Sequence, residues 1–565
     1  MKAFYLVKID EASHHWVKVH LKLTGNFAAS LTVFLPSWSP GSYLMREYSR
    51  HLQALRCEGS LGEAIDFEQC AKGQWQLDFK DKNYEEIHLY YQVYCHELTV
   101  RTSHINSEHA FLHGPSYLMG VKGERLEGAQ LQLKFPALWS KVTCPLKEIS
   151  QVRDEFIYES EDYDHLLDSP IEIGCHSTDG FYYAGKEHAL AHFGTLWFDQ
   201  TQLKNDIHKI VEYIGNYMGE IPYENYYFIN HFIPGGYGGL EHHDSTVLQF
   251  DGRLLEKRGE YVKWLQLVAH EYFHTWNVKR IRPKELGPFE YTEENYTSML
   301  WLAEGLTSFM DNYFVFKAGL CTEQEYLKTL SNDFQRFQQT VGKKFDSLEM
   351  SSFNAWIKLY RPHENSQNST ISYYLKGGLV FLVLHILLKK NGSDIKDLIH
   401  ALWQDYKKRP SRGITKEEFS QILLTLIPKD DFEKWISMIE TTEDIDFSYY
   451  LKHVGLEIVE KREEKCHLGL EVKAFHGRLM IEKVSLDSPA YRAGLNAGDE
   501  ILAIDHCRVL PSEWSKIEEI MQENQSTEWL IARNQMVQNL TVSAGCPIKK
   551  IEEIRVIDPV KFKGF

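Results

Sequence analysis

The sequence HEYFH contains the residues with the clearest capacity for chemistry. His270 and His274 are four positions apart, so on a helix they lie one turn apart on one face and both imidazoles can reach a single metal ion. Glu271 is the only other acidic or basic residue in positions 264–278. A lone charge on such an apolar helix is costly to bury without a partner. The motif therefore indicates a metal-binding helix, although H-E-x-x-H also occurs by chance in proteins that bind no metal.

A second apolar stretch offers a third ligand. In residues 297–310, TSMLWLAEGLTSFM, the only ionisable side chain is that of Glu304. This carboxylate requires a cation, which is either a zinc ion shared with His270 and His274 or an arginine or lysine elsewhere in the chain. Asp311, seven residues further along the same helix face, is placed to accept a hydrogen bond from a ligand histidine.

Three protein ligands leave one coordination position for water, which is the arrangement of a catalytic zinc site with one ion per chain. Zinc lowers the pKa of such a water to about 7. Glu271, between the two histidines, is placed to take the proton of the water and to pass it to a leaving amine. These residues predict a hydrolytic zinc site and leave open what binds the substrate.

The elements that position these residues belong to a large chain. Its 565 residues suggest three or four domains, and a composition with 43% hydrophobic and 25% charged residues is typical of globular proteins. The formal net charge of −17 argues against nucleic acid as a partner. The longest apolar run, residues 379–388, has about half the length of a membrane span, and residues 1–30 show no secretory signal. Nine cysteines without a CxxC pair do not suggest disulfides. We expect a cytoplasmic protein with reduced thiols and no membrane partner.

The first 165 residues have the pattern of β-strands. Val17, Val19, Leu21 and Leu23 alternate with polar residues, which is the period of a strand with one buried face. Turn-rich segments separate similar runs further along, so a β-sandwich or a large twisted sheet is predicted.

The pattern becomes helical from about residue 201, and residues 323–439 are almost purely helical. Thr415 and Glu418 form a capping-box signature before an apolar run. The charged residues 459–465 are typical of a linker to a last, mixed block.

Longer segments resemble a known family. HEYFHTWNVKRIRP and ENYTSMLWLAEGLTSF are similar to the glycyl aminopeptidase family of gluzincin zinc metallopeptidases, relatives of aminopeptidase N. PSWSPGSYLMREYSR is similar to the N-terminal β-domain of that family, and HLGLEV with SPAYRAGLNAGDEILAID resembles a PDZ domain. The resemblance implies a multidomain α+β protein with an N-terminal all-β domain (1–165), a thermolysin-like zinc catalytic domain (166–320), an α-helical domain (321–457), a C-terminal PDZ domain (462–545) and a C-terminal tail (546–565).

The resemblance also implies a residue that stabilises the oxyanion. SYYLKGG is similar to the Tyr-x-Lys-Gly segment of the aminopeptidase N clan, whose tyrosine corresponds to Tyr374. Tyr373 beside it is the alternative, and the structural alternative for either tyrosine is packing in the core.

GGYGGLEH resembles the Gly-x-Met-Glu-Asn segment that lines the substrate cleft in that clan. By this resemblance Gly238 and Gly239 let the backbone approach a bound peptide, and Glu241 binds the α-ammonium of the substrate. Leu240 and His242 depart from the methionine and the asparagine of that segment. A glycine-rich hairpin with a solvated glutamate is the alternative.

The PDZ resemblance implies a second binding loop. The backbone N–H groups of Leu468, Gly469 and Leu470 would bind the C-terminal carboxylate of a peptide. The alternative is a module that only packs against the catalytic body.

Together with the resemblance, these residues predict a zinc aminopeptidase that acts on peptide substrates, and the resemblance implies a preference for Gly or Ala as the first residue. One alternative is a zinc endopeptidase that tethers its substrates through the PDZ domain. The other is a non-catalytic PDZ interaction protein.

Overall fold

The structure is a computed structural model that describes residues 1–565 except 29, 81, 125, 153–154 and 464. The chain forms two compact units. The first contains Met1–Thr297, Met310–Cys321 and Leu402–Thr415, and the second contains Ser298–Phe309, Thr322–Ala401 and Lys416–Phe565. Among the described helices, none is both long enough and apolar enough to cross a membrane.

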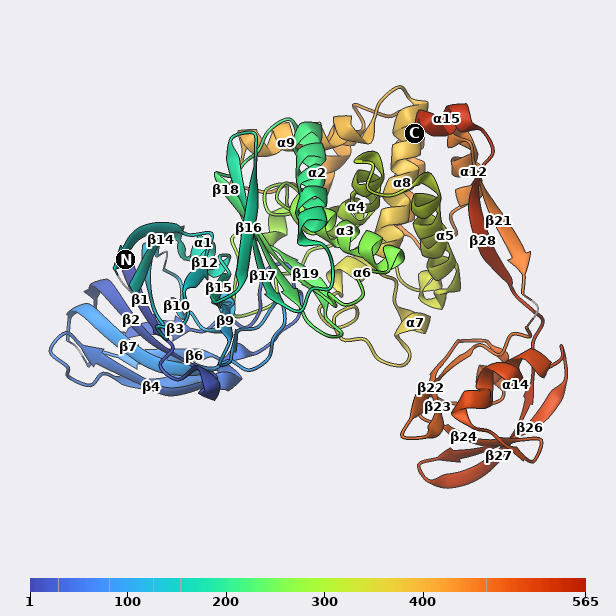
Figure 1. Cartoon of the computed structure of the whole chain (residues 1–565), viewed down its shortest axis with the longest axis horizontal. Helices are drawn as coiled ribbons and strands as arrows, with labels where there is room; N and C mark the ends of the chain where they lie inside the picture. The colour runs from blue at the N-terminus through green and yellow to red at the C-terminus, as the bar shows by residue number, and fades with distance from the viewer. Residues whose placement is uncertain (29, 81, 125, 153–154, 464) are drawn as a thin grey trace. The chain divides into compact units, whose positions relative to one another are not determined.

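The first unit begins with three β-sheets, drawn in blue to cyan in Figure 1. Their strand orders are β13-β14-β11-β1-β2-β7-β4, β10-β3-β6-β5 and β12-β15-β9-β8. The strands are β1 (Lys2–Lys8), β2 (Trp16–Phe27), β3 (Ser30–Phe34), β4 (Leu52–Gly59), β5 (Asp66–Ala71), β6 (Gln74–Asp78), β7 (Tyr84–Tyr94), β8 (His104–Ile105), β9 (His109–Leu112), β10 (Gly120–Val121), β11 (Glu127–Lys134), β12 (Lys141–Thr143), β13 (Lys147–Val152), β14 (Glu155–Asp162) and β15 (Ile171–Gly174). On β2 the alternating Val17, Val19, Leu21 and Leu23 are at most 2% exposed, which confirms the predicted strand and the all-β character of this region.

The β-region continues past residue 165, the boundary predicted from the sequence. Strand β15 pairs antiparallel with β9, with Ile171 opposite Leu112. All four residues of β15 are buried, because the strand lies inside its sheet between β12 and β9. A short strand that is buried on both faces shows no polar alternation, so a search for period 2 misses it.

A mixed five-stranded sheet follows, with the order β16-β17-β18-β20-β19. Strands β17, β18 and β20 are parallel, whereas β16 and β19 are antiparallel to their neighbours. The elements here are α1 (Tyr163–Leu167), β16 (Ser177–Tyr183), β17 (Lys186–Gly194), α2 (Gln200–Met218), β18 (Asn225–Phe232), β19 (Tyr237–Glu241), β20 (Ser245–Phe250) and α3 (Arg258–Phe273). Helix α3 packs on β19 and β20, so the helix that carries HEYFH lies against the edge strand that ends in Glu241.

Helices dominate residues 298–454, as predicted for residues 323–439. They are the π-helical turn η5 (Trp301–Gly305), α4 (Leu306–Lys317), α5 (Glu323–Gln339), α6 (Leu348–Phe353), α7 (Ser366–Ser369), α8 (Leu375–Lys390), α9 (Ile395–Lys408), α10 (Lys416–Leu423), α11 (Lys429–Glu440) and α12 (Phe447–Leu451). Helix α5 begins with a capping box in which Thr322 and Glu325 satisfy each other's backbone N–H groups.

The C-terminal region is a β-block inserted into a two-stranded ribbon of β21 (Leu456–Arg462) and β28 (Lys549–Val556). The block has one sheet with the order β22-β23-β24-β26-β27 and its own apolar core. Its elements are β22 (Leu470–Phe475), β23 (Arg478–Val484), α13 (Pro489–Arg492), β24 (Glu500–Ile504), β25 (Cys507–Arg508), α14 (Trp514–Ile520), β26 (Ser526–Arg533) and β27 (Met536–Ser543).

The structure corrects the predicted C-terminal tail (546–565), because these residues contain β28 and the helix α15 (Pro559–Lys563). Strand β28 packs on α5, and the amide of Ile554 donates a hydrogen bond to Ser331 Oγ at 2.8 Å. Ile554 is the one fully buried residue of β28. A strand with one buried residue has the same sequence pattern as a solvated segment, so the sequence alone does not reveal β28.

Candidate metal centre and catalytic residues

Helix α3 places the two histidines of the predicted metal site. His270 lies in its last turn, and His274 follows as the C-cap residue with φ −57° and ψ −19°. Because these angles are still right-handed helical, the four-residue spacing keeps both imidazoles on one face. His274 is 1% exposed, and the side chain of His270 is 12% exposed.

Each histidine is oriented by a hydrogen bond at Nδ1. His270 Nδ1 lies 2.9 Å from Asp311 Oδ2, and His274 Nδ1 lies 2.6 Å from the backbone oxygen of Asn277. Both acceptors require the hydrogen to be on Nδ1, so the Nε2 lone pair of each ring is left for a metal ion. This donor set fits zinc, and the contact with Asp311 is the one that its spacing predicts.

A π-helical turn carries the third candidate ligand. Glu304 lies in η5 and is 2% exposed. Single π-helical turns are rare and are frequent at functional sites, but the sequence pattern does not reveal this one. His270 and His274 belong to the first compact unit, and Glu304 belongs to the second.

Two glycines allow η5 to cross α8 closely. A Cβ atom on Gly305 would lie 2.8 Å from the Cα atom of Gly377, and a Cβ on Gly377 would be equally close to Gly305. Because no side chain fits between these backbones, the crossing fixes Glu304 relative to the start of α8, where Tyr374 is the N-cap residue. Gly377 of SYYLKGG therefore has a packing role.

The two candidate tyrosines have different surroundings. Tyr373 is 0% exposed and belongs to the core, whereas Tyr374 is partly exposed. The hydroxyl of Tyr374 lies 3.2 Å from that of Tyr360. Burial and then the charge of Glu304 raise the pKa of Tyr374 well above its usual value, so the hydroxyl keeps its proton beside Glu304. These contacts favour Tyr374, and they add Tyr360, which no sequence motif indicated.

Two further glycines lie directly beside the carboxylates of Glu271 and Glu241. A Cβ atom on Gly239 would collide with Glu271 Oε1, and a Cβ on Gly41 would lie 2.5 Å from Glu241 Oε1. The absence of a side chain at Gly239 therefore makes room for Glu271, whereas the predicted approach of a bound peptide at Gly239 stays a prediction. Gly41 has φ +84°, which favours glycine for its backbone alone, and its place beside Glu241 is visible only in the fold.

Glu241 is a buried carboxylate near the catalytic helix. It is 4% exposed, and its ligand atom lies within 4.8 Å of those of Glu271 and His274. In the part of the chain that the structure describes, its carboxylate has no hydrogen bond and no ion pair. It lines a cavity of about 270 Å³ together with Gly41 and Lys279.

The two departures from the Gly-x-Met-Glu-Asn segment have structural explanations. Leu240 is 0% exposed and packs in a small apolar cluster. His242 is 1% exposed, and its Nδ1 lies 2.9 Å from Asp168 Oδ1. Arg101, which the sequence did not single out, donates a hydrogen bond from Nη2 to the backbone oxygen of Gly239 at 3.0 Å. This contact supports strand β19, which carries Gly239, Leu240 and Glu241.

Comparisons with known proteins agree with this geometry. Residues 4–175 match the Peptidase M61 N-terminal domain, and residues 263–380 match the M61 glycyl aminopeptidase. A crystal structure of an aminopeptidase N family protein from Idiomarina loihiensis is 28% identical, covers 100% of this chain and 99% of its own, and has a TM-score of 0.92. This chain is a metallopeptidase with M61 family domains. A search of curated proteins gives no match.

More distant structures share the fold of this M61-type metallopeptidase. An M1 zinc metallopeptidase from Deinococcus radiodurans is 11% identical with a TM-score of 0.51, over 79% of this chain and 94% of its own. A mutant of that enzyme bound to a Tyr-Ser-Ala substrate is 10% identical with the same TM-score and the same coverage. At this identity the likeness concerns the fold alone.

The residues predicted for a peptide-carboxylate loop lie at the start of the C-terminal β-block of this metallopeptidase. Leu468 is 5% exposed and belongs to the apolar core of the block, and Leu470 begins β22. Gly469 has φ +73°, and a Cβ atom there would collide with Ser488. Strand β22 is an edge strand of its sheet, which leaves one side of its backbone for a further strand.

Proposed function

We propose that this metallopeptidase is a zinc aminopeptidase that hydrolyses the N-terminal residue from peptides. The observation that carries the proposal is the position of Glu241, a buried carboxylate within 4.8 Å of the ligand atoms of Glu271 and His274. No described cation of the protein pairs with it. The α-ammonium of a substrate is the group that would complete such a carboxylate.

The short distances around Glu241 suit an exopeptidase. In a peptide, the α-nitrogen of the first residue lies about 2.5 Å from the carbonyl carbon of that residue, because a single Cα separates them. A carbonyl that is attacked beside Glu271 therefore has its α-nitrogen within reach of Glu241. Gly41 borders the same carboxylate.

In this proposal His270, His274 and Glu304 hold one zinc ion, which when bound lowers the pKa of a water and polarises the substrate carbonyl. Glu271 takes the proton of the attacking water and passes it to the leaving amine. Tyr374 donates a hydrogen bond to the oxyanion. The raised pKa of Tyr374 supports this role, because its hydroxyl is a donor at neutral pH.

We further propose a small first residue, glycine or alanine. The support comes from the matched family domain, whose description names a glycyl aminopeptidase.

Paired substrates test the proposal. Free alanine amide should be hydrolysed, and its N-acetylated form should be cut at least about thirty-fold more slowly, because losing one partner of a buried charge pair costs roughly 2–5 kcal/mol. Glu241→Gln should shrink this ratio by losing activity on the free amide. Elemental analysis should find about one zinc per chain in both proteins. Internal cleavage of blocked peptides as fast as free ones would support the PDZ-tethered endopeptidase instead.

The C-terminal β-block is proposed to be a PDZ-type module that binds a peptide C-terminus. The edge strand β22 and the preceding Gly469 loop support this, because such a peptide adds a strand to a sheet edge and places its carboxylate on loop N–H groups. A peptide with a free C-terminus should bind the full-length protein, and the same peptide with a C-terminal amide should not. Equal binding of both would contradict the proposal.

A cytoplasmic location is also proposed. All nine cysteines are free thiols, as is usual in a reducing compartment.

A further inference from the structure

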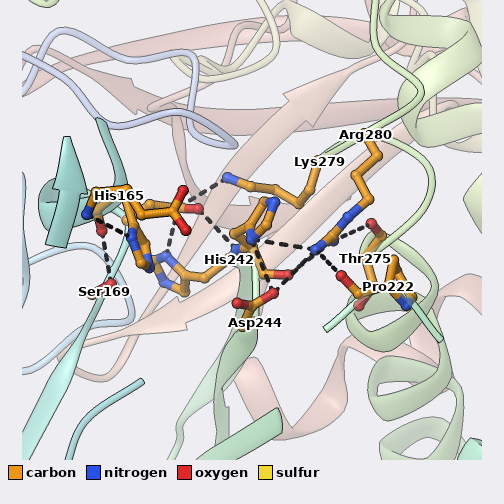
Figure 2. Close-up of polar contacts among 11 residues, drawn as sticks. His165, Ser169, Pro222, His242, Asp244, Thr275, Lys279 and Arg280 are labelled. Carbon is orange, nitrogen blue, oxygen red and sulfur yellow. Dashed lines mark hydrogen bonds and ion pairs between the residues drawn. The ribbon is translucent and has the colours of Figure 1, made fainter. Parts of the chain in front are cut away.

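Asp168 binds the cationic side chain of Lys279, which lines the same cavity as Glu241. Asp168 Oδ1 accepts a hydrogen bond from Lys279 Nζ at 2.9 Å and lies 2.9 Å from His242 Nδ1. Its Oδ2 accepts from the amide of His243 at 2.8 Å. Figure 2 draws the contacts of Lys279 and His242 as dashed lines. Burial alone would raise the pKa of Asp168, but Lys279 and His242 together hold it well below its usual range.

The cavity that Lys279 lines holds further carboxylates, and Glu241 is the buried one among Glu161, Asp162, Asp164, Glu241 and Asp244. Lys279, Asp168 and Glu241 all line the cavity of about 270 Å³. The side chain of Lys279 is 10% exposed, and among the described residues Asp168 is its one ion-pair partner. A buried ammonium without a counter-charge is strongly unfavourable. Should Asp168 lose its charge, Glu241 is the buried carboxylate of this cavity that has no cation of its own.

We infer that Asp168 is a positioning residue that keeps Lys279 away from Glu241 and so leaves Glu241 open to the α-ammonium of the substrate. The inference rests on the proposed function, because it requires Glu241 to bind an amine. In this arrangement Lys279 is an internal competitor of the substrate, and Asp168 suppresses the competition by binding the Lys279 ammonium itself.

Arg280, the residue after Lys279, is a cation whose position is fixed by backbone acceptors. Its guanidinium donates to the backbone oxygens of His243, Thr275 and Pro222 at 3.0, 2.8 and 2.9 Å. It also donates to Asp244 Oδ1 at 3.1 Å, and Figure 2 shows Arg280 directed toward Asp244. The three backbone acceptors hold the guanidinium in place without Asp244. Asp244→Asn therefore removes a carboxylate from the same cavity without releasing a cation, which makes it the matched control.

A double-mutant cycle tests the inference on free alanine amide. Asp168→Asn keeps the hydrogen-bonding shape and removes the charge, so KM should rise about tenfold or more while kcat stays within about threefold and zinc content is unchanged. Lys279→Met and the control Asp244→Asn should keep KM near the wild-type value. The double variant Asp168→Asn/Lys279→Met should return KM to within about threefold of wild type, because the competitor is gone.

A purely structural role for Asp168 predicts the opposite coupling, with the double variant as impaired as Asp168→Asn or worse. That result overturns the inference, and so does an unchanged KM in a folded, zinc-replete Asp168→Asn protein. If Asp168→Asn is not recovered folded, Asp168→Ser serves in the same cycle. The two proposals fail separately: an unchanged ratio of free to blocked hydrolysis in Glu241→Gln rejects the amine-binding role itself. A reduced ratio there, with an unchanged KM in Asp168→Asn, rejects only the role of Asp168.

Discussion

Glu172 and Glu241 are buried carboxylates in the same unit with opposite surroundings. Glu172 is 0% exposed and Glu241 is 4% exposed. His109 Nδ1 lies 2.6 Å from one oxygen of Glu172, and His231 Nε2 lies 2.9 Å from the other, whereas the described residues offer no such partner to Glu241. Burial alone would raise the pKa of Glu172, but the two histidines outweigh it and lower the pKa to about 2.

The difference separates a carboxylate that joins elements of the fold from one to which the proposed function assigns a ligand. Glu172 lies on β15, His109 on β9 and His231 on β18, so their hydrogen bonds join a strand of the five-stranded sheet to two strands of the preceding β-region. A buried carboxylate with no partner contributes no such link and is unfavourable on its own. Glu172 is therefore explained by the strands that it connects, whereas Glu241 is explained by the substrate amine only under the proposed function.

The largest expected effect concerns Glu271, a third buried carboxylate, which lies close to Glu241. Glu271→Gln should lower kcat by roughly 10²–10⁴-fold, because it removes the proton carrier and no metal ligand. Zinc content and the thermal midpoint should stay close to those of wild type. Elemental analysis and steady-state kinetics on free alanine amide check both expectations. A metal-free Glu271→Gln protein would contradict the assigned roles.

Glu172→Gln should affect stability where Glu271→Gln affects catalysis. Removing one partner of a buried ion pair typically costs about 3–5 kcal/mol of unfolding free energy, so urea denaturation should report a loss of that order. The kcat/KM of the folded variant should stay near wild type. Glu241→Gln is the matched control and should lose little stability or gain some, since no hydrogen bond is removed. Equal losses in both variants would break the distinction.

The pH dependence of stability sharpens the same contrast. The folded pKa of Glu172, about 2, lies below the ordinary glutamate value of about 4.3. Glu172 therefore contributes stability that is present above about pH 4.3 and is lost as the pH falls toward 2. Across this window the wild type should lose on the order of 3 kcal/mol more unfolding free energy than Glu172→Gln does. Parallel losses in the two proteins would contradict this assignment.

Tyr373 and Tyr374 offer the same comparison between a residue of the core and a residue with a proposed catalytic role. Tyr374→Phe should lower kcat about a hundred-fold with KM nearly unchanged, because the loss of one oxyanion donor costs on the order of 3 kcal/mol. Tyr373→Phe should leave kcat near wild type, since Tyr373 belongs to the core. Tyr360→Phe should have an intermediate effect through the hydroxyl of Tyr374. If Tyr373→Phe shows the large loss instead, the assignment is reversed.

The smallest expected effect comes from removing the C-terminal β-block, which holds none of these carboxylates. Excision of residues 467–545, with a short Gly-Ser linker across the gap, should leave kcat/KM for alanine amide within about twofold of wild type. Truncation after residue 461 is a different experiment, because it also removes β28 from its contact with α5. A folded, zinc-replete excision variant without activity would show that the block shapes the catalytic site.

The sequence predicts the parts of the site that depend on short spacings. HEYFH is recognisable because its two histidines are four residues apart on one helix. The alternation of buried and polar residues on β2 is recognisable because it too lies within a few neighbouring residues. Asp168 and Lys279 are 111 residues apart, and His109 and Glu172 are 63 residues apart. Such pairs arise from the tertiary packing of distant segments, which a local pattern does not encode.

The missed backbone features have a similar cause. The π-helical turn at Glu304 and the crossing at Gly305 and Gly377 depend on how two helices meet, so neither glycine could be assigned a role from its own neighbours in sequence. Strand β28 was not predicted because its own sequence contains few apolar residues. Its burial comes from its partners β21 and α5.

The ribbon of β21 and β28 also determines how the protein unfolds when tension acts on the C-terminal β-block. The β-block is attached at one end of this antiparallel pair, where Arg462 lies opposite Lys549. Tension on the block therefore loads the hydrogen bonds of the ribbon one pair at a time, as in a zipper, rather than all together in shear. The register shift between Val459 and Glu460 interrupts the ladder partway along. Tension on the block would thus open the ribbon from the end formed by Arg462 and Lys549.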